Sequence, residues 1–403
     1  MAELKDRPPV EDWATDFDHF DPAFIADPVP VWNELRERCP VAHSERYNGL
    51  NVVTRWEDVA AVAHDTATFS SRRIVINELP THHRGLPLPP INDDPPLHTM
   101  KRRVMLPFFN PIAIKRWEEP VREICRRALD VIDQRGGTDV DLAVDYAQVI
   151  PAELTAIMLG VKLEDVPQFR VWLHDLLEVG PTDIEVARET SRIMQEYMAE
   201  LLADRRANGG DDLVTYLLGQ TIDGEEISDA EMINMLFLLL IAGIDTTWSG
   251  IGFSLLHLAT HPEDRRRLVA EPALVGSAVE EFLRLYPPVW VARVAQHDTE
   301  VAGCPVAQGE WVVLGIPAAN RDPEVYEDPD EAHIDRERNL HASFGLGVHR
   351  CLGSNLARME MLVAFQEWLT AFPDYHLDEG ARGVTTWANG QVRGPRSIPV
   401  RLR

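Results

Sequence analysis

The chain has 403 residues, with 65 acidic against 39 basic side chains and a formal net charge of -26. Such a charge excludes nucleic acid and anionic membranes as general partners, because both require a basic surface. The four cysteines show no CxxC spacing, so neither a zinc site nor a disulfide framework is expected, and a cytoplasmic location fits. The first residues, "MAELKDRPPVEDW", contain no apolar segment typical of a signal peptide. Without a linker or repeat to divide it, the chain 1–403 is expected to form a single domain.

The first half of the chain contains one hairpin signal and several helical patterns. Asn48 and Gly49 lie between extended flanks in "HSERYNGLNVVTR", and this pair predicts a β-hairpin. Apolar residues that recur with a helical period predict amphipathic helices around residues 113–134, 151–160 and 184–206.

A long helix is predicted in the middle of the chain, where Ser228 and Glu231 form a capping box and Thr260 lies shortly before a proline. Between residues 232 and 259 the only side chain charged at neutral pH is Asp245. A run this long and apolar is also a candidate membrane span. Its Asn, Ser, Thr and His residues and its acidic flank "DGEEISDAE" favour a buried core helix, so no membrane partner is expected. A carboxylate in such surroundings needs a partner, a water chain or a catalytic task.

The last third of the chain mixes helices and short strands. Thr260 with Glu263 predicts a capping box for a short helix, and a further helix near 273–286 ends at a Pro-Pro pair. "VWVARVAQ" and "GEWVVLGI" are predicted strands, and residues 353–371 are a predicted helix. Many helices with small, scattered sheets predict a mainly α fold with small β-sheets.

The most informative stretch is "FGLGVHRCLG", residues 344–353. Its glycines permit turns and a close approach to something flat or bulky. Cys351 lies where this loop enters a helix, and backbone N–H groups at a helix start favour thiolate over thiol. A soft, anionic sulfur suits iron. The stretch matches neither a dinucleotide fingerprint nor a phosphate loop.

This stretch resembles the haem-binding loop of the cytochrome P450 family, with Phe344, a Gly-x-Gly, His349, Cys351 and Gly353 in the family's order. The resemblance implies a cytochrome P450 fold, in which a long central helix lies over a haem held by the cysteine loop. It also implies that Cys351 is the iron ligand, and such a thiolate favours O–O cleavage. The haem is expected to be haem b, because the chain has no Cys-x-x-Cys-His attachment motif.

Further motifs follow in the family's order over nearly the whole chain. "AGIDTT" at 242–247 resembles the oxygen-binding groove of the central helix, where Ala242 and Gly243 allow a close approach to the haem. Within it, Thr246 is the expected proton donor or water anchor, and Asp245 the expected relay from solvent. The alternative is an ordinary polar helix face paired with other side chains.

Other residues are assigned by the same resemblance. "HTMKR" at 98–102 resembles the haem-propionate motif and supplies His98 and Arg102, and "VARVAQHD" supplies Arg293 at another propionate position. With His349, these residues are the expected charge-assisted partners of the two haem carboxylates. "EEFLRLYPP" at 280–288 carries the structural pair Glu281 and Arg284, with Arg336 as a third member. Glu-x-x-Arg spacing recurs elsewhere in the chain as ordinary helix-surface pairs, so only the Pro-Pro stop and the place before the cysteine loop single this pair out.

The resemblance implies a monooxygenase that oxidises a small organic substrate with O2. Its two electrons are expected to come from NAD(P)H through a separate ferredoxin and an NAD(P)H-dependent ferredoxin reductase, because no flavin or ferredoxin segment is recognised in the chain. One alternative is a peroxide-driven peroxygenase, against which the Asp245-Thr246 pair argues. The other alternative is a non-catalytic haem carrier or gas sensor, in which a proton relay would have no function.

The substrate pocket and the docking face are also assigned by family position. Residues 74–92 and 172–183, Ala242, and the stretch Val289, Trp290, Val291 and Ala292 are expected to line the pocket, which Trp290 narrows. A basic cluster comprising Lys101, Arg103, Arg350 and Arg358 is expected to dock an acidic ferredoxin, because the rest of the chain would repel it.

Overall fold

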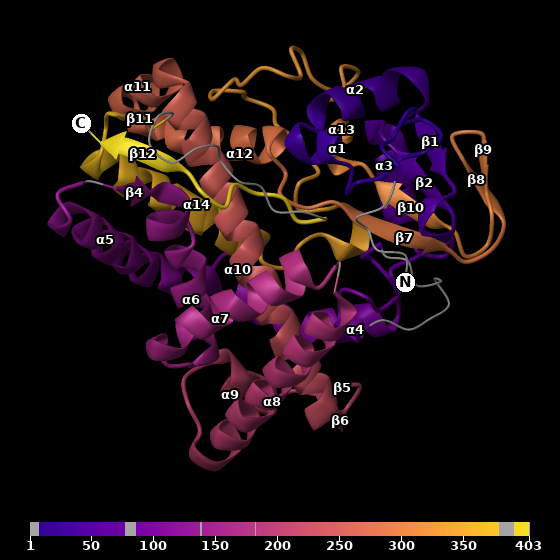
Figure 1. Ribbon diagram of the computed structural model, residues 1–403. Helices are drawn as coiled ribbons and strands as arrows, with labels where there is room; N and C mark the ends of the chain where they lie inside the picture. The colour runs from indigo at the N-terminus through magenta and orange to yellow at the C-terminus, as the bar shows by residue number, and fades with distance from the viewer. Residues whose placement is uncertain (1–7, 77–85, 138, 182, 379–390, 403) are drawn as a thin grey trace.

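A computed structural model describes residues 8–76, 86–137, 139–181, 183–378 and 391–402. Helices make up most of it, and α10 (Asp229–Thr260) runs through the middle of the molecule. Figure 1 shows the largest sheet and the first short helices on one side of α10, and the helices of the segment 118–208 on the other. α10 packs against α6, α8, α12 and α14, so it forms the central element of the core.

The remaining helices are distributed along the whole chain. They are α1 (Pro22–Ala26), α2 (Val29–Arg38), α3 (Trp56–His64), α4 (Leu97–Phe109), α5 (Glu118–Gln134), α6 (Val149–Leu159), α7 (Val166–His174), α8 (Ile184–Asn208), α9 (Leu213–Leu218), α11 (Pro262–Ala270), α12 (Val275–Leu285), α13 (Ile316–Ala319) and α14 (Ser354–Ala371). Short 3-10 or π-helical turns lie at Arg46–Asn48, Ala113–Trp117, Ala143–Ala147, Leu163–Asp165, Asp175–Val179, Pro272–Leu274 and Gly347–His349. The predicted amphipathic helices are present, whereas α2, α3, α4 and α7 were not predicted.

Within the described ranges, the strands are short and form four small sheets. They are β1 (Val41–Ser44), β2 (Leu50–Val53), β3 (Phe69–Ser70), β4 (Val140–Asp141), β5 (Thr221–Ile222), β6 (Glu225–Glu226), β7 (Val291–Ala295), β8 (Thr299–Val301), β9 (Cys304–Val306), β10 (Trp311–Leu314), β11 (Tyr375–Leu377) and β12 (Pro399–Leu402). The largest sheet has the order β1-β2-β10-β7-β3, and a three-stranded sheet has the order β11-β12-β4. The predicted hairpin is present: Ser44 pairs with Leu50, and Asn48 lies in its turn with a φ of 65°.

The long helix α10 begins as predicted, but its capping box is only half formed. The Ser228 side chain accepts a hydrogen bond from the Glu231 amide, whereas the Glu231 carboxylate pairs with Lys101. The second predicted capping box is wrong, because the Thr260 hydroxyl bonds back to carbonyls of its own helix and α11 has no side-chain cap. Although α10 is long and apolar enough to span a membrane, 67% of its most apolar window is buried inside the fold. It is therefore packed as a core helix.

Candidate active site

A cavity of about 290 Å³ lies against α10 and the loop that leads into α14. α10 contributes Ala242, Gly243 and Thr246 to its wall. The other residues singled out from the sequence that line it are His98, Arg102, Val289, Val291, Arg293, Phe344, His349, Cys351 and Gly353. The cavity therefore brings together segments that are far apart in the sequence, from Val59 to Met361.

Cys351 is held by a loop whose glycines are required by geometry. Gly347 has a φ of +67°, and a Cβ there would lie 2.4 Å from the Ala63 carbonyl oxygen. The Cys351 amide donates to the Phe344 carbonyl at 2.6 Å, which closes the loop just before α14. The Cys351 side chain is exposed toward the cavity, so a ligand placed there can reach its sulfur.

The sequence predicts that the start of α14 favours the thiolate form of Cys351, and the surroundings of the sulfur correct part of this expectation. Burial among protein atoms raises the pKa of the Cys351 thiol, and only part of this is offset by the Gly353 N–H and by Arg102 and Arg350. The Gly353 N–H at the helix start favours the thiolate, but it does not outweigh burial. A metal ion bound at the sulfur would, because a coordinating thiol is deprotonated outright.

Four nitrogen-bearing side chains converge on one end of the cavity, namely His98, Arg102, Arg293 and His349. The His98 Nδ1 and His349 Nε2 atoms are buried and have no hydrogen-bond partner among the residues that the structure describes, and the two ring centroids lie 4.1 Å apart. Among the described residues, neither Arg102 nor Arg293 is paired with a carboxylate; the Arg293 guanidinium donates to the neighbouring Ala292 carbonyl.

The electrostatics of this end show that an anionic partner fits it. Burial lowers the pKa of Arg293 to about 10. Burial, followed by the charges of Arg293, His98 and Arg102, lowers the pKa of His349 to about 3. Buried cations are normally paired, because an unpaired buried charge is costly. These residues therefore fit a cavity ligand that carries carboxylates, as the two propionates of haem would supply.

The polar residues of α10 lie on different faces of the helix. Ala242 and Thr246 face the cavity, and the Thr246 hydroxyl donates to the Ala242 carbonyl at 2.8 Å. Gly243 lets α6 approach, since a Cβ there would lie 3.0 Å from the Thr155 hydroxyl. Asp245 is 2% exposed and is not part of the cavity wall.

Asp245 has a partner that the sequence did not reveal. Its Oδ1 atom accepts a hydrogen bond from Arg396 Nη2 at 2.8 Å, whereas Oδ2 is buried and has no hydrogen-bond partner within the ranges that the structure describes. Burial raises the pKa of Asp245, and the charge and hydrogen bond of Arg396 oppose this rise. The two residues are 151 positions apart and share no motif, so no sequence signal could have paired them.

The comparisons with known proteins agree with this geometry. The cytochrome P450 family model matches residues 47–376. The chain belongs to the cytochrome P450 family.

Its relatives and structural neighbours are bacterial cytochromes P450, and members of this family are haem-iron monooxygenases. The polyketide biosynthesis cytochrome P450 PksS of Bacillus subtilis is 30% identical, over 94% of this chain and 96% of the relative. The vitamin D(3) 25-hydroxylase of Pseudonocardia autotrophica is 34% identical, over 96% of each. The solved structure of PksS has a TM-score of 0.87 at 30% identity, covering 96% of this chain and 99% of PksS. A mutant of P450 EryK in complex with erythromycin B has a TM-score of 0.85 at 31% identity, covering 94% and 97%.

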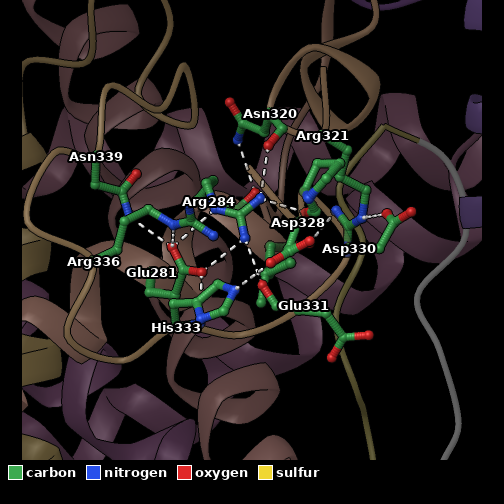
Figure 2. A network of polar contacts seen from close by, with 12 residues as sticks. Glu281, Arg284, Asn320, Arg321, Asp328, Asp330, Glu331, His333, Arg336 and Asn339 are labelled. Carbon is green, nitrogen blue, oxygen red and sulfur yellow. Dashed lines mark hydrogen bonds and ion pairs between the residues drawn. The ribbon is translucent and has the colours of Figure 1, made fainter. Parts of the chain in front are cut away.

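In this cytochrome P450, Glu281 and Arg284 form a fully buried ion pair outside the cavity (Figure 2). Arg284 Nη2 lies 2.7 Å from Glu281 Oε1, and Arg284 Nε lies 2.9 Å from Oε2. Figure 2 shows three further donors to Glu281: the His333 amide, Arg336 Nε and Asn339 Nδ2, at 2.9, 3.1 and 2.9 Å. Arg284 also donates to backbone carbonyls of residues 320, 329 and 331. The pair thus ties α12 to the long loop that follows α13.

The structure corrects the substrate-pocket prediction for Trp290 and Ala292. Val289 and Val291 line the cavity, but Trp290 and Ala292 belong to a second core cluster on the opposite side of the strand. The Trp290 ring is 3% exposed and packs against His19 at a centroid distance of 5.1 Å. Successive residues of a strand point to opposite faces, so a four-residue run cannot line one wall.

Of the two longer segments predicted to line the pocket, 74–92 and 172–183, only part of the first lies at the cavity. Ile74, Pro90 and Ile91 line the cavity, whereas residues 77–85 of the same predicted segment lie outside the described residues. None of the described residues of 172–183 lines the cavity. Instead, Glu178 pairs with Arg396 at 2.7 Å.

The basic cluster predicted to dock ferredoxin is also corrected. Lys101 is 7% exposed, and its Nζ atom lies 2.9 Å from the Asp93 carboxylate as well as contacting Glu231. Arg358 is paired with Glu280. A side chain that is already held in an ion pair is not available to steer a partner. Only Arg103 and Arg350 of the cluster are exposed.

Proposed function

We propose that this protein is a haem b monooxygenase that oxidises a small organic substrate with O2 and two electrons from NAD(P)H. We further propose that the electrons arrive through a separate ferredoxin and an NAD(P)H-dependent ferredoxin reductase, in the cytoplasm, and that residues 1–403 act as one domain. One observation carries the proposal. Cys351 faces the same cavity as His98, Arg102, Arg293 and His349, whose buried nitrogens have no carboxylate partner among the described residues.

The chain's own residues would hold the cofactor at two ends. Cys351 would ligate the iron, with Phe344 and Gly353 beside it in the cavity wall. The guanidinium groups of Arg102 and Arg293 would form charge-assisted hydrogen bonds to the propionates. When bound, haem supplies an iron at which O2 is activated and one oxygen atom is transferred to the substrate.

α10 would prepare the opposite wall for this chemistry. The small side chain of Ala242 leaves space in the cavity, and the Thr246 hydroxyl faces the same space. Because Thr246 already donates to the Ala242 carbonyl, its oxygen lone pairs are available to accept from a water molecule. Turning the hydroxyl away from that carbonyl would make its proton available to the cavity. Asp245, one residue earlier on α10, would return that proton from solvent.

The wall residues favour an apolar substrate. Beyond the groups assigned to haem, the described cavity wall contains apolar side chains such as Leu238, Leu239, Val289 and Val291. Such a wall excludes bulk water from the reacting centre. A peroxygenase or a haem carrier would have no use for a hydroxyl and a buried carboxyl placed next to each other on α10, so the monooxygenase is favoured over both alternatives.

The docking site for an acidic ferredoxin is proposed around Arg103 and Arg350. Both are exposed, and Arg350 is adjacent to Cys351 in the loop. Charge on such a surface raises the association rate more than the affinity, and it is screened by salt.

Three measurements test the proposal on one preparation. The purified protein should contain haem extractable by acid acetone, and its reduced carbon monoxide complex should show the red-shifted Soret band of thiolate ligation. Small apolar compounds should displace a water from the iron and shift the Soret band to shorter wavelength. With a non-cognate [2Fe–2S] ferredoxin and its reductase, NADH oxidation should yield a product heavier by one oxygen atom. Product formed only with added peroxide would overturn the monooxygenase assignment.

A further inference from the structure

Arg396 occupies a position between two carboxylates. Its Nη2 atom donates to Asp245 Oδ1 at 2.8 Å, its Nε atom donates to Glu178 Oε1 at 2.7 Å, and its Nη1 atom donates to the Ser249 hydroxyl at 3.1 Å. The guanidinium also lies 4.1 Å from the centroid of the Trp248 ring. Side-chain exposure rises from 3% at Asp245 through 9% at Arg396 to 21% at Glu178, so the three groups lead from the core toward the surface.

The C-terminal segment that carries Arg396 is fixed against α10 by close packing. A Cβ on Gly394 would lie 2.2 Å from the Ser249 hydroxyl oxygen, so only glycine fits there. On the other side of Arg396, the Ser397 hydroxyl and the Ile398 amide donate to the Asp141 carboxylate at 2.6 and 2.9 Å. The backbone is therefore held on both sides of Arg396, which fixes where the guanidinium can reach.

One cation shared by two carboxylates couples them. An arginine stays protonated in proteins, so Arg396 cannot itself carry the proton that Asp245 would deliver. It can only set how firmly Asp245 is held and in which protonation state. The charge of Glu178 acts in the opposite sense to that of Arg396 on Asp245, because a second carboxylate disfavours ionisation of the first.

We propose that Arg396 is a positioning residue for proton delivery, which fixes the carboxyl group of Asp245, the residue before Thr246 on α10, and that Glu178 weakens this hold by sharing the guanidinium. This rests on the proposed monooxygenase function, in which Asp245 returns a proton to the cavity. Arg396 keeps Oδ1 of Asp245 engaged and leaves Oδ2 as the oxygen that can bind and release the proton. Glu178 lies in the π-helical turn Asp175–Val179 after α7, so a movement of that turn would change the hold on Asp245.

The test is an infrared titration of the Asp245 carboxyl in the ferric holoenzyme. The protonated carboxyl band that disappears in Asp245→Asn assigns the signal. Among the described residues, the charged groups that act on Asp245 are Arg396 from the C-terminal segment and Glu178 from the turn after α7. In Arg396→Gln the midpoint of this band should move to higher pH by about one unit or more, because the attractive charge is lost. In Glu178→Gln it should move to lower pH, because the guanidinium then serves Asp245 alone.

Opposite shifts are the decisive result, since a purely structural role would move both midpoints alike or neither. Glu185→Gln serves as the matched control: it removes an exposed carboxylate from the first turn of the neighbouring α8, paired with Arg188, and should leave the midpoint unchanged. If Arg396→Gln does not fold, Glu178→Gln alone decides, because the Glu178 side chain is 21% exposed and the expected direction of its shift is specific. A midpoint that is unmoved or raised in Glu178→Gln overturns the proposal. A wild-type protein without the thiolate carbon monoxide spectrum would instead refute the proposed function, and that spectrum is recorded separately.

Discussion

Arg358 and Glu280 form a bidentate ion pair between α14 and α12, with Nε–Oε1 and Nη2–Oε2 distances of 2.6 and 2.9 Å. The same guanidinium lies 4.4 Å from the centroid of the Phe344 ring, at the start of the cysteine loop. Burial raises the pKa of Glu280, but hydrogen bonds from His341 and Arg358 outweigh it and lower that pKa to about 2. Arg358 therefore supports the cysteine loop and is not available to a docking partner.

Reversing the charge of Arg358 should damage the fold around Cys351. In Arg358→Glu two carboxylates would face each other in place of the ion pair, and breaking a buried pair costs about 3–5 kcal/mol. This pair is half-buried, so the loss should fall below that range. The depressed pKa of Glu280 contributes stability above the usual carboxyl pKa, and this contribution is lost as pH falls toward about 2. Denaturant unfolding of the variant at neutral and acidic pH measures both effects.

Arg103→Glu should behave differently, because Arg103 is exposed on α4. We expect unchanged stability and an unchanged carbon monoxide spectrum, together with slower reduction by ferredoxin at low ionic strength. The difference from wild type should shrink as salt is added, since the Debye length falls from ~10 Å at 0.1 M to ~3 Å at 1 M. Stopped-flow reduction at several salt concentrations checks this. Equal rates of reduction by ferredoxin for Arg103→Glu and wild type at low salt would contradict docking at this surface.

Arg293→Met should have effects of opposite sign in the haem-free and haem-bound proteins. Arg293 is 4% exposed and has no carboxylate partner among the described residues, so replacing it removes an uncompensated buried charge. Replacing buried charges by apolar residues often stabilises a protein by about 1–4 kcal/mol. The haem-free variant should therefore be more stable to denaturant, whereas the haem-bound variant should release its cofactor faster to an acceptor globin.

Arg321→Met provides the matched control for Arg293→Met. Arg321 is also 4% exposed, but it pairs with Asp330 at 3.1 Å and donates to the Leu285 carbonyl at 2.6 Å. Its loss should destabilise both forms of the protein. If Arg293→Met destabilises the haem-free protein as Arg321→Met does, Arg293 is a structural residue and the propionate assignment fails.

Thr246→Ala should separate electron consumption from product formation. The variant keeps Cys351 and the propionate-binding residues, so haem and substrate binding should be unchanged. Without the hydroxyl, the cavity loses its positioned proton donor, and removing such a group typically costs about 10²–10⁴-fold in its step. NADH should still be oxidised, with hydrogen peroxide released in place of product. Product yield per NADH equal to that of wild type would contradict this role, and Thr246→Ser is expected to retain part of the coupling.

The sequence was informative where the signal is local. Ser228 caps α10, Asn48 lies in the hairpin turn, and Cys351 with its flanking glycines forms the loop in front of α14, because each depends on neighbouring residues alone. Trp290 was misplaced for a local reason as well: the residues were assigned to the pocket without the alternation that a strand imposes.

Non-local pairing explains most of the remaining differences. From the sequence, Lys101 and Arg358 were predicted to belong to a basic patch. In the fold, Lys101 pairs with Asp93 and Glu231, and Arg358 pairs with Glu280. In the same way, Arg396 acquires its position at Asp245 only when the C-terminal segment packs on α10. A charged side chain therefore reveals its role only together with the partner that the fold brings to it.

Glu360 faces the cavity, and among the described residues no cation pairs with it. It is 2% exposed, and its Oε2 atom is buried and has no hydrogen-bond partner in the described part of the chain. Burial alone raises the pKa of Glu360 well above its usual value. The folded protein therefore holds a proton on Glu360 at a pH where the unfolded chain, with a carboxyl pKa of about 4.3, has released it. Stability must then fall as pH rises between those two values, with a slope of up to about 1.4 kcal/mol per pH unit.

Glu360→Gln should remove this dependence, because the amide is nearly isosteric with the protonated acid and does not titrate. The free energy of unfolding of the variant should match wild type near the carboxyl pKa and exceed it increasingly toward neutral pH, as measured by denaturant unfolding across that range. Glu367→Gln on the same helix is the control: its carboxylate binds Arg122 at 2.6 Å and Arg126 at 3.1 Å, so its loss should lower stability at neutral pH. A difference between Glu360→Gln and wild type that stays constant with pH would show that Glu360 is ionised in the fold, with a cationic partner or a bound water that keeps it so.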